Sequence, residues 1–325
     1  MTIKNISLLA CVFGLIACSC GQKTTTNTAV TEQRYEKVSP DFNADSAYHF
    51  VDTQVAFGPR VPNTSQHVAC GDYLVSELKR FGAAVIEQRA DLKAFDGTVL
   101  RSRNIIGTFN AENPNRILLF AHWDSRPFSD NDPDVGKHSQ PVLGANDGAS
   151  GVGVLLEIAR TIQIKSPDLG VDIIFFDAED YGEHESSQGW CLGSEYWSRN
   201  PHVPGYKARF GILLDMVGAP DATFYKEAIS RQYARNVVEK VWSTARNLGY
   251  GKYFVDRDGG GITDDHVPVN QILRIPSIDI IHNDMNTESG FGWYWHTTKD
   301  DMNSISKETL KAVGQTVLEV VYKEK

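Results

Sequence analysis

Short apolar runs that alternate with longer amphipathic segments constrain the fold of this chain more than any other feature. The clearest run covers residues 171–176, where Asp172 is the one polar position. A strand of this kind is typical of a parallel sheet that is covered on both faces. Strands that alternate with helices favour such a sheet, joined by right-handed crossovers. The pattern predicts a single α/β domain with a twisted, mostly parallel central sheet and helices on both faces.

Other segments continue this alternation. Apolar residues recur at helical spacing in several segments, and short apolar runs that end in polar residues indicate further strands. In open α/β sheets, ligands lie outside the carboxyl ends of the strands, so we expect the functional site there. The predicted helices are 46–57, 65–81, 150–164, 231–248 and 304–322, and the predicted strands are 104–109, 116–121, 171–176, 210–214 and 277–281.

The first residues indicate export. Lys4 precedes an apolar run over residues 6–17, which is shorter than the roughly 20 residues that span a bilayer and suits a secretory signal. The run ends in the sequence LIAC, which resembles the bacterial lipoprotein cleavage box and would place the lipid on Cys18; an ordinary cleaved signal is the alternative. The predicted segments are a lipoprotein signal peptide (1–17), a flexible tether (18–38) and a catalytic α/β domain (39–325).

Charge and targeting limit the partners. The formal net charge of −9 argues against nucleic acid, because phosphate binding needs a basic surface. Several acyl chains on one cysteine would anchor the protein stably to a membrane. We therefore expect a monomer in a bacterial cell envelope, attached only through its N-terminal lipid and either periplasmic or surface-exposed.

Acidic side chains follow three of the predicted strands. Glu179 and Asp180 follow one strand, Asp215 follows another, and Asp147 lies in a glycine-rich segment before a helix. Two carboxylates about 4 Å apart repel by roughly 4 kcal/mol at an effective dielectric near 20, so a cluster of them needs protons or a metal. A helix cap or a phosphate-binding turn is the simpler reading of Asp147 alone.

Histidines complete a possible zinc site. Carboxylates with histidine suit Zn²⁺, which takes three protein ligands at a catalytic site. His122 follows the first of the acid-bearing strands, His296 lies in a tryptophan-rich segment, and His266 is a candidate for a supporting role. The sequence alone does not distinguish one zinc ion from two.

These motifs resemble the zinc aminopeptidase-like superfamily. The resemblance runs from about residue 40 to the C-terminus, through a His-x-Asp motif, the segment NDGASG at 146–151, the acidic pair after the strand and a late histidine. Within that superfamily the chain is most similar to the glutaminyl cyclases, because of LLDMVGAP at 213–220, DDHVP at 264–268 and WHT at 295–297. These enzymes convert an N-terminal glutamine to pyroglutamate and release ammonia.

The resemblance implies a role for each site residue. One Zn²⁺ per chain would activate the glutamine side chain, and the substrates would be N-terminal glutaminyl peptides and proteins. Asp180 departs from the glutamate that many animal cyclases have at this position. The implied residues are the zinc ligands Asp147, Asp180 and His296, the general acid/base Glu179, the hydrogen-bonded acid pair Asp215 and Asp264, and the substrate-contacting Trp190, Trp293 and Trp295.

Two other functions remain open. In a two-zinc aminopeptidase, His122 would bind a second metal, Asp147 would bridge both ions and Glu179 would activate water. Asp264 and the tryptophans favour the cyclase. A surface lipoprotein that only binds a ligand is the third alternative, although Glu179 and every implied ligand are present.

Overall fold

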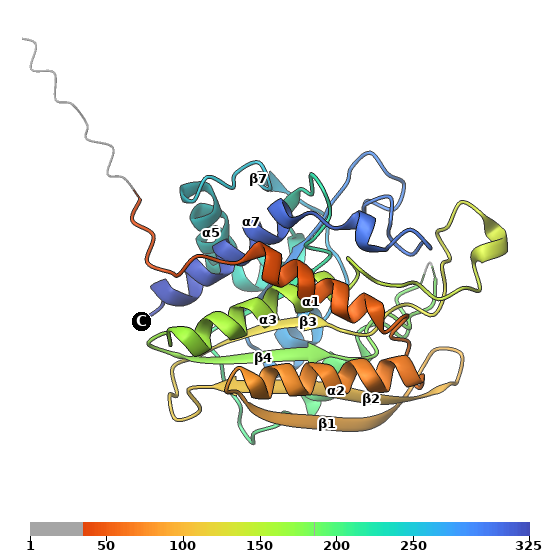
Figure 1. Ribbon diagram of the computed structural model, residues 1–325, viewed down its shortest axis with the longest axis horizontal. Coiled ribbons are helices and arrows are strands. Elements are labelled where there is room, and N and C mark those ends of the chain that lie inside the picture. Colours follow the sequence, from red (N-terminus) through yellow and green to blue (C-terminus); the bar gives the residue numbers. More distant parts are fainter. Residues whose placement is uncertain (1–34, 185) are drawn as a thin grey trace, which may run out of the picture. The chain divides into compact units, whose positions relative to one another are not determined.

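The computed structural model describes residues 35–184 and 186–325 (Figure 1). Its main sheet has six strands in the order β1-β2-β4-β3-β5-β8, and β6 and β7 form a separate pair. No helix in this part of the chain is long and apolar enough to span a bilayer. The strands are β1 (Ala84–Lys93), β2 (Val99–Phe109), β3 (Arg116–His122), β4 (Gly170–Phe176), β5 (Gly211–Asp215), β6 (Phe224–Lys226), β7 (Phe254–Asp258) and β8 (Ser277–Ile281).

Helices lie on both faces of the sheet. The longer ones begin after side chains that accept backbone N–H groups, such as Asn43, Thr64 and Ser306. A short helical segment, α6 (His266–Pro268), continues into the π-helical turn Val269–Leu273. The main helices are α1 (Ala44–Ala56), α2 (Ser65–Arg80), α3 (Ala149–Ile164), α4 (Leu192–Arg199), α5 (Ala228–Asn247) and α7 (Lys307–Lys323).

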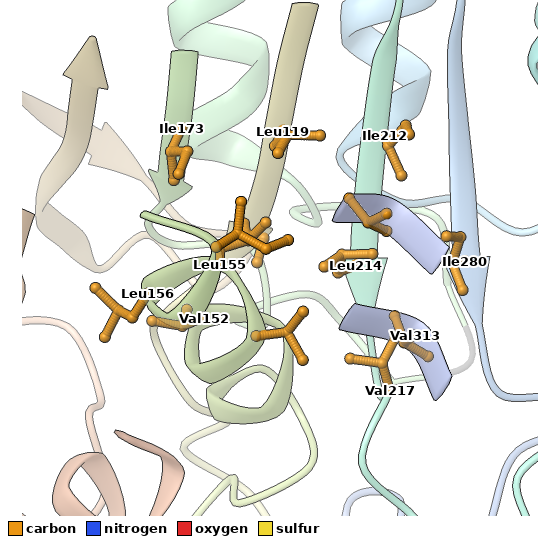
Figure 2. Packing of buried hydrophobic residues seen from close by; sticks show 14 of the residues in the cluster. Leu119, Val152, Leu155, Leu156, Ile173, Ile212, Leu214, Val217, Ile280 and Val313 are labelled. Carbon is orange, nitrogen blue, oxygen red and sulfur yellow. The ribbon is translucent and has the colours of Figure 1, made fainter. Parts of the chain in front are cut away.

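The two faces of the sheet have separate cores, because successive side chains of a strand point to opposite sides. Leu119 of β3 packs in the larger core, which also contains residues of α1, α2, α3, α5 and α7. Figure 2 shows Val152 and Leu155 of α3 beside strand residues such as Leu214 in this core. Phe120, the next residue of β3, packs in the smaller core with Trp197 of α4. Both layers hold the strands rigidly from the two sides.

Strand direction places the site. β3, β4, β5 and β8 pair in parallel, so their carboxyl ends lie at one edge of the sheet. The predicted α/β class and covered sheet are confirmed. The edge formed by β1 and β2 was missed: β1 pairs antiparallel with β2, and β2 pairs antiparallel with β4.

β1 escaped sequence analysis because it lies at the edge of the sheet. Its residues alternate between exposed and half-buried, so it lacks the apolar run that marks the central strands. Helix α4 was also missed, since its eight residues lie at the end of a segment rich in glycine and serine. At the other end, Tyr35 and Val38 already hydrogen-bond to Glu319 of α7, before the predicted domain start at residue 39. Residues 1–34, with the predicted signal peptide and Cys18, lie outside the described part.

Candidate zinc-dependent active site

A cavity of about 410 Å³ lies at the edge where the parallel strands end. Its walls come from the loops after β4, β5 and β8, together with the segment that precedes α3. Most of the predicted site residues meet in it. The lining residues are Asp147, Glu179, Asp180, Ser186, Ser187, Trp190, Asp215, Met216, Ile262, Thr263, Asp264, Ile281, Phe291, Trp295 and His296.

Three of these side chains form a possible metal site. One ligand atom from each of Asp147, Asp180 and His296 lies within 4.8 Å of the others, and all three residues are buried. His296 Nε2 is 3.3 Å from Asp180 Oδ1 and 3.8 Å from Asp147 Oδ2. Two carboxylates and an imidazole are a ligand set of catalytic zinc sites, which leave a further position for water or substrate.

The electrostatics of this group favour a bound cation. Burial raises the pKa of Asp180 to about 6, and the negative charge of Asp147 raises it further. Burial also works against a charged His296, but Asp180 and Asp130 outweigh it and raise the pKa of the imidazole. Since buried carboxylates that face each other are costly to ionise, a divalent ion would stabilise the fully deprotonated ligands.

Asp147 is fixed by its backbone. The amide N–H groups of Asn146 and Asp147 donate to the two carboxylate oxygens of Asp300, at 2.8 and 3.0 Å. The next residue, Gly148, lies so close to His122 that a Cβ there would come within 2.4 Å of its Nε2 and its carbonyl oxygen. The glycine-rich sequence therefore serves the close approach of the Asp147 loop to β3.

Glu179 and Asp180 are held by Asp124, two residues beyond the end of β3. The two carboxylate oxygens of Asp124 accept the backbone N–H groups of Glu179 and Asp180, each at 3.2 Å. Ala178 has a left-handed backbone (φ 56°) that turns the chain away from β4. Burial raises the pKa of Glu179 well above its ordinary value. Its Oε1 accepts a hydrogen bond from the thiol of Cys191 at 3.2 Å.

Sequence analysis missed Arg126 and Asp130, which support the metal site from behind. Arg126 Nε donates to Asp130 Oδ1 at 2.9 Å, and Nη1 donates to the backbone oxygen of Asp180 at 3.0 Å. Asp130 Oδ1 lies 3.4 Å from His296 Nδ1. An arginine and an aspartate four residues apart, just after an acid-bearing strand, were the signal in the sequence.

Two of the three predicted tryptophans lie at the cavity. Trp295 stacks on the ring of His296 at 3.8 Å between centroids, and Trp190 lies parallel to that ring at 5.8 Å. Arg126 lies over the other ring system, 4.8 Å from the centroid of Trp190. The prediction for Trp293 does not fit: its side chain is 58% exposed and is not among the residues that line the cavity. Alternate residues in this segment point in different directions, and Trp293 points to solvent.

The predicted acid pair lies in the cavity, but each acid has another hydrogen-bond partner. Asp215 Oδ1 bonds to His122 Nε2 at 3.1 Å, and Asp264 Oδ1 accepts the backbone N–H of Asp265 at 2.6 Å. Burial, together with the charge of Asp215, raises the pKa of Asp264 well above its ordinary value. A shared proton between the two acids stays a prediction. His266 bonds to Glu227 at 3.2 Å rather than to a zinc ligand.

Comparison with known proteins assigns this fold and site to a class. Peptidase family M28 matches residues 104–321, and the chain belongs to that family. The structure superposes on a Zn-dependent exopeptidase from Parabacteroides distasonis with a TM-score of 0.87, 62% identity, and coverage of 88% of this chain and 100% of the other. The donor set found here agrees with that zinc dependence.

Two further relatives carry different activities in their names. The chain is 59% identical to the Bacteroides thetaiotaomicron glutaminyl cyclase, with a TM-score of 0.87 and coverage of 89% and 100% of the two chains. It is 31% identical over 272 residues to aminopeptidase YwaD of Bacillus subtilis, covering 81% of this chain. The chain spans about half, 54%, of the length of YwaD. The predicted resemblance to bacterial glutaminyl cyclases is thus confirmed at the level of sequence and fold.

Proposed function

We propose that this protein is a glutaminyl cyclase, which converts the N-terminal glutamine of peptides and proteins to pyroglutamate with release of ammonia. The observation that carries the proposal is the single cavity in which Asp147, Asp180 and His296 converge beside Glu179. The 59% identity to a bacterial glutaminyl cyclase, over the whole of that protein, supports it.

The cavity suits an intramolecular reaction. The α-amine of the substrate attacks the carbon of its own side-chain amide, a C–N bond forms, and the amide C–N bond then breaks to release ammonia. A zinc ion held by Asp147, Asp180 and His296 supplies a Lewis acid for the amide oxygen. Glu179 takes a proton from the attacking amine and gives it to the leaving nitrogen, the role of a general acid/base.

The other cavity residues orient the substrate. The tryptophan rings of Trp190 and Trp295 form apolar walls that exclude water and strengthen electrostatic interactions within the site. The raised pKa of Asp264 favours a protonated carboxyl, which can donate to the substrate amide while Asp215 accepts. Neither role needs a water nucleophile.

A two-zinc aminopeptidase is the second candidate, favoured by one specific observation. His122, Asp147 and Asp215 form a further buried group whose ligand atoms lie within 4.8 Å of one another. His122 Nε2 is 2.9 Å from Asp147 Oδ1, so Asp147 could bridge two ions. The name of YwaD is consistent with this activity.

One experiment separates the two candidates. The purified protein is assayed for ammonia release from a Gln-initiated dipeptide and for cleavage of a Leu-aminoacyl fluorogenic substrate, with zinc counted per chain. We expect ammonia release, no cleavage of the leucyl substrate and one zinc per chain. Cleavage of the leucyl substrate with two zinc ions would overturn the proposal in favour of the aminopeptidase.

The cellular location is also part of the proposal. We infer a monomeric lipoprotein of the bacterial cell envelope, anchored through Cys18, from the sequence LIAC and the polar segment that follows it. Metabolic labelling with a palmitate analogue should mark the full-length protein and leave the Cys18→Ala variant unlabelled. Equal labelling of both would contradict the anchor, and a dimer in sedimentation experiments would contradict the monomer.

A further inference from the structure

A second cavity of about 470 Å³ adjoins the active site. Ile262, Thr263 and Phe291 line both cavities, so the two share one wall. This wall comes from the segment before α6 and from the loop after β8. A substrate chain that leaves the active site on this side would enter the second cavity at once.

The second cavity is lined by uncharged groups. Tyr225, Ile262, Met285 and Phe291 give it apolar and aromatic surface, and polar residues such as Asn283 complete its walls. A Cβ added at Gly260 would meet no heavy atom within 4 Å, so this glycine leaves space in the cavity. Met285 is 70% exposed, an unusual position for a large apolar side chain unless a ligand covers it. The surface suits a bulky, uncharged side chain.

Asn283 provides a second observation that points to a ligand. Its side chain is 8% exposed, and its Oδ1 has no hydrogen-bond partner in the described part of the protein. A buried acceptor without a partner is costly. An N–H group brought by a bound peptide would satisfy it after a small adjustment of the side chain.

The shared wall is held firmly in place. Glu227, which precedes α5, accepts the backbone N–H of Ile262 at 3.0 Å. The N–H of Ala228 donates to the backbone oxygen of Gly260 at 2.9 Å, and that of Gly259 donates to Lys226 at 2.8 Å. The segment is thus tied to the first turn of α5, which gives the cavity a defined shape before a ligand binds.

The length of a peptide matches this arrangement. When the glutamine side chain reaches the zinc ligands, its own carbonyl group continues to the second residue, about 3.5 Å further along the chain. That step takes the second residue from the first cavity to the shared wall at Ile262 and Phe291. The position of the second cavity therefore corresponds to the residue that follows the glutamine.

We propose that this cavity is a binding site for the second residue of the substrate, and that it selects glutaminyl peptides with a large apolar or aromatic residue after the glutamine. The inference rests on the proposed cyclase function. Removal of such a side chain from water on binding favours it over glycine, because little apolar surface can be buried with glycine.

The test compares Gln-Phe-amide with Gln-Gly-amide and uses the ratio of their kcat/KM values. We expect a ratio of about ten for the wild-type protein, the scale of partial burial of one apolar side chain. Gly260→Leu fills the cavity and should lower the ratio to about three or less, a change of the same origin. Gly251→Leu, a substitution at a surface glycine with one neighbouring atom at 3.6 Å, should keep the wild-type ratio.

Each outcome has a separate meaning. Met285→Ala changes an exposed side chain and should also lower the ratio, which provides a second test should Gly260→Leu fail to fold. A ratio near one in the wild-type protein, or one unchanged in both variants, would overturn the second-residue site while leaving cyclase activity intact. Absence of ammonia release from both substrates would instead overturn the proposed function itself.

Discussion

The carboxylate of Asp130 lies 3.4 Å from Nδ1 of His296, the ring nitrogen opposite the one that approaches Asp180. Arg126 holds this carboxylate with its guanidinium group and is itself 1% exposed. Histidines that bind metals commonly donate their second N–H to a carboxylate, which fixes the tautomer and the ring orientation. Asp130 therefore positions His296 for zinc without reaching the ion itself.

Removal of this carboxylate should weaken zinc binding. We expect Asp130→Ala to lower the zinc affinity by about 10- to 100-fold, the usual effect of losing such an outer partner. Competition with a chelator measures the affinity directly, independently of activity. Asp91→Ala, at an exposed position of β1, is the matched control and should bind zinc normally. Wild-type affinity in Asp130→Ala would show that the contact is incidental.

Glu179 should separate catalysis from metal binding. Its carboxylate lies in the cavity next to the ligand Asp180, and Glu179→Gln preserves the shape of the side chain while removing its ability to accept and return a proton. We expect at least about a hundredfold loss of turnover, the usual contribution of a general acid/base. Metal analysis should still find the wild-type zinc content. Near-normal turnover would assign proton transfer to another group.

The ligand Asp180 should behave in the opposite way. Asp180→Ala removes one of three donors, so zinc content should fall together with activity. Wild-type zinc stoichiometry in this variant would rule out Asp180 as a ligand.

These residues illustrate what the sequence could predict. Asp147, Asp180 and His296 were accessible because strand ends, a glycine-rich turn and a family resemblance pointed to the same edge of the sheet. Arg126 and Asp130 were not, since charged residues in a loop have the same pattern whether they face solvent or a buried histidine. Only the packing of the loop against the site distinguishes the two.

The errors have similar physical causes. β1 has alternating exposure and few apolar residues, because an edge strand has less surface to bury than a central strand. For Trp293, the proximity of a tryptophan to a ligand in sequence did not predict the direction of its side chain, which depends on the turn between them. Local pattern predicted which segments reach the site, and tertiary structure decided which side chains enter it.

Cys191 should tune the geometry of Glu179. Its thiol lies 3.2 Å from Glu179 Oε1, and both Cys191 and Cys70 are free, buried cysteines. We expect Cys191→Ala to lower kcat about two- to tenfold, the kinetic equivalent of one net hydrogen bond, with little change in KM. Cys191→Ser retains a donor and should recover most of the loss. Equal activity of the alanine variant and the wild-type protein would dismiss the contact, and Cys70→Ala serves as the control for a buried thiol away from the site.

Glu227 should make the stability of the fold depend on pH. Burial opposes ionisation of this side chain, but His266 and the backbone N–H groups of Ser230 and Ile229 outweigh it, so the pKa falls to about 2. The unfolded chain takes up a proton near the ordinary glutamate value of 4.5, whereas the folded protein keeps Glu227 ionised. The stability that Glu227 adds is therefore complete above pH 4.5 and is lost as the pH falls towards 2.

Glu227→Gln tests this dependence. At pH 7 the variant should lose about 1–2 kcal/mol of unfolding free energy, the range for a side chain that caps a helix. The difference from the wild-type protein should shrink at pH values below the ordinary pKa of glutamate, because the unfolded wild-type chain is then protonated. Denaturant unfolding at neutral and acidic pH measures both values, with the exposed Glu195→Gln as the control. A difference that stays constant with pH would mean that Glu227 stabilises α5 by packing and not by its charge.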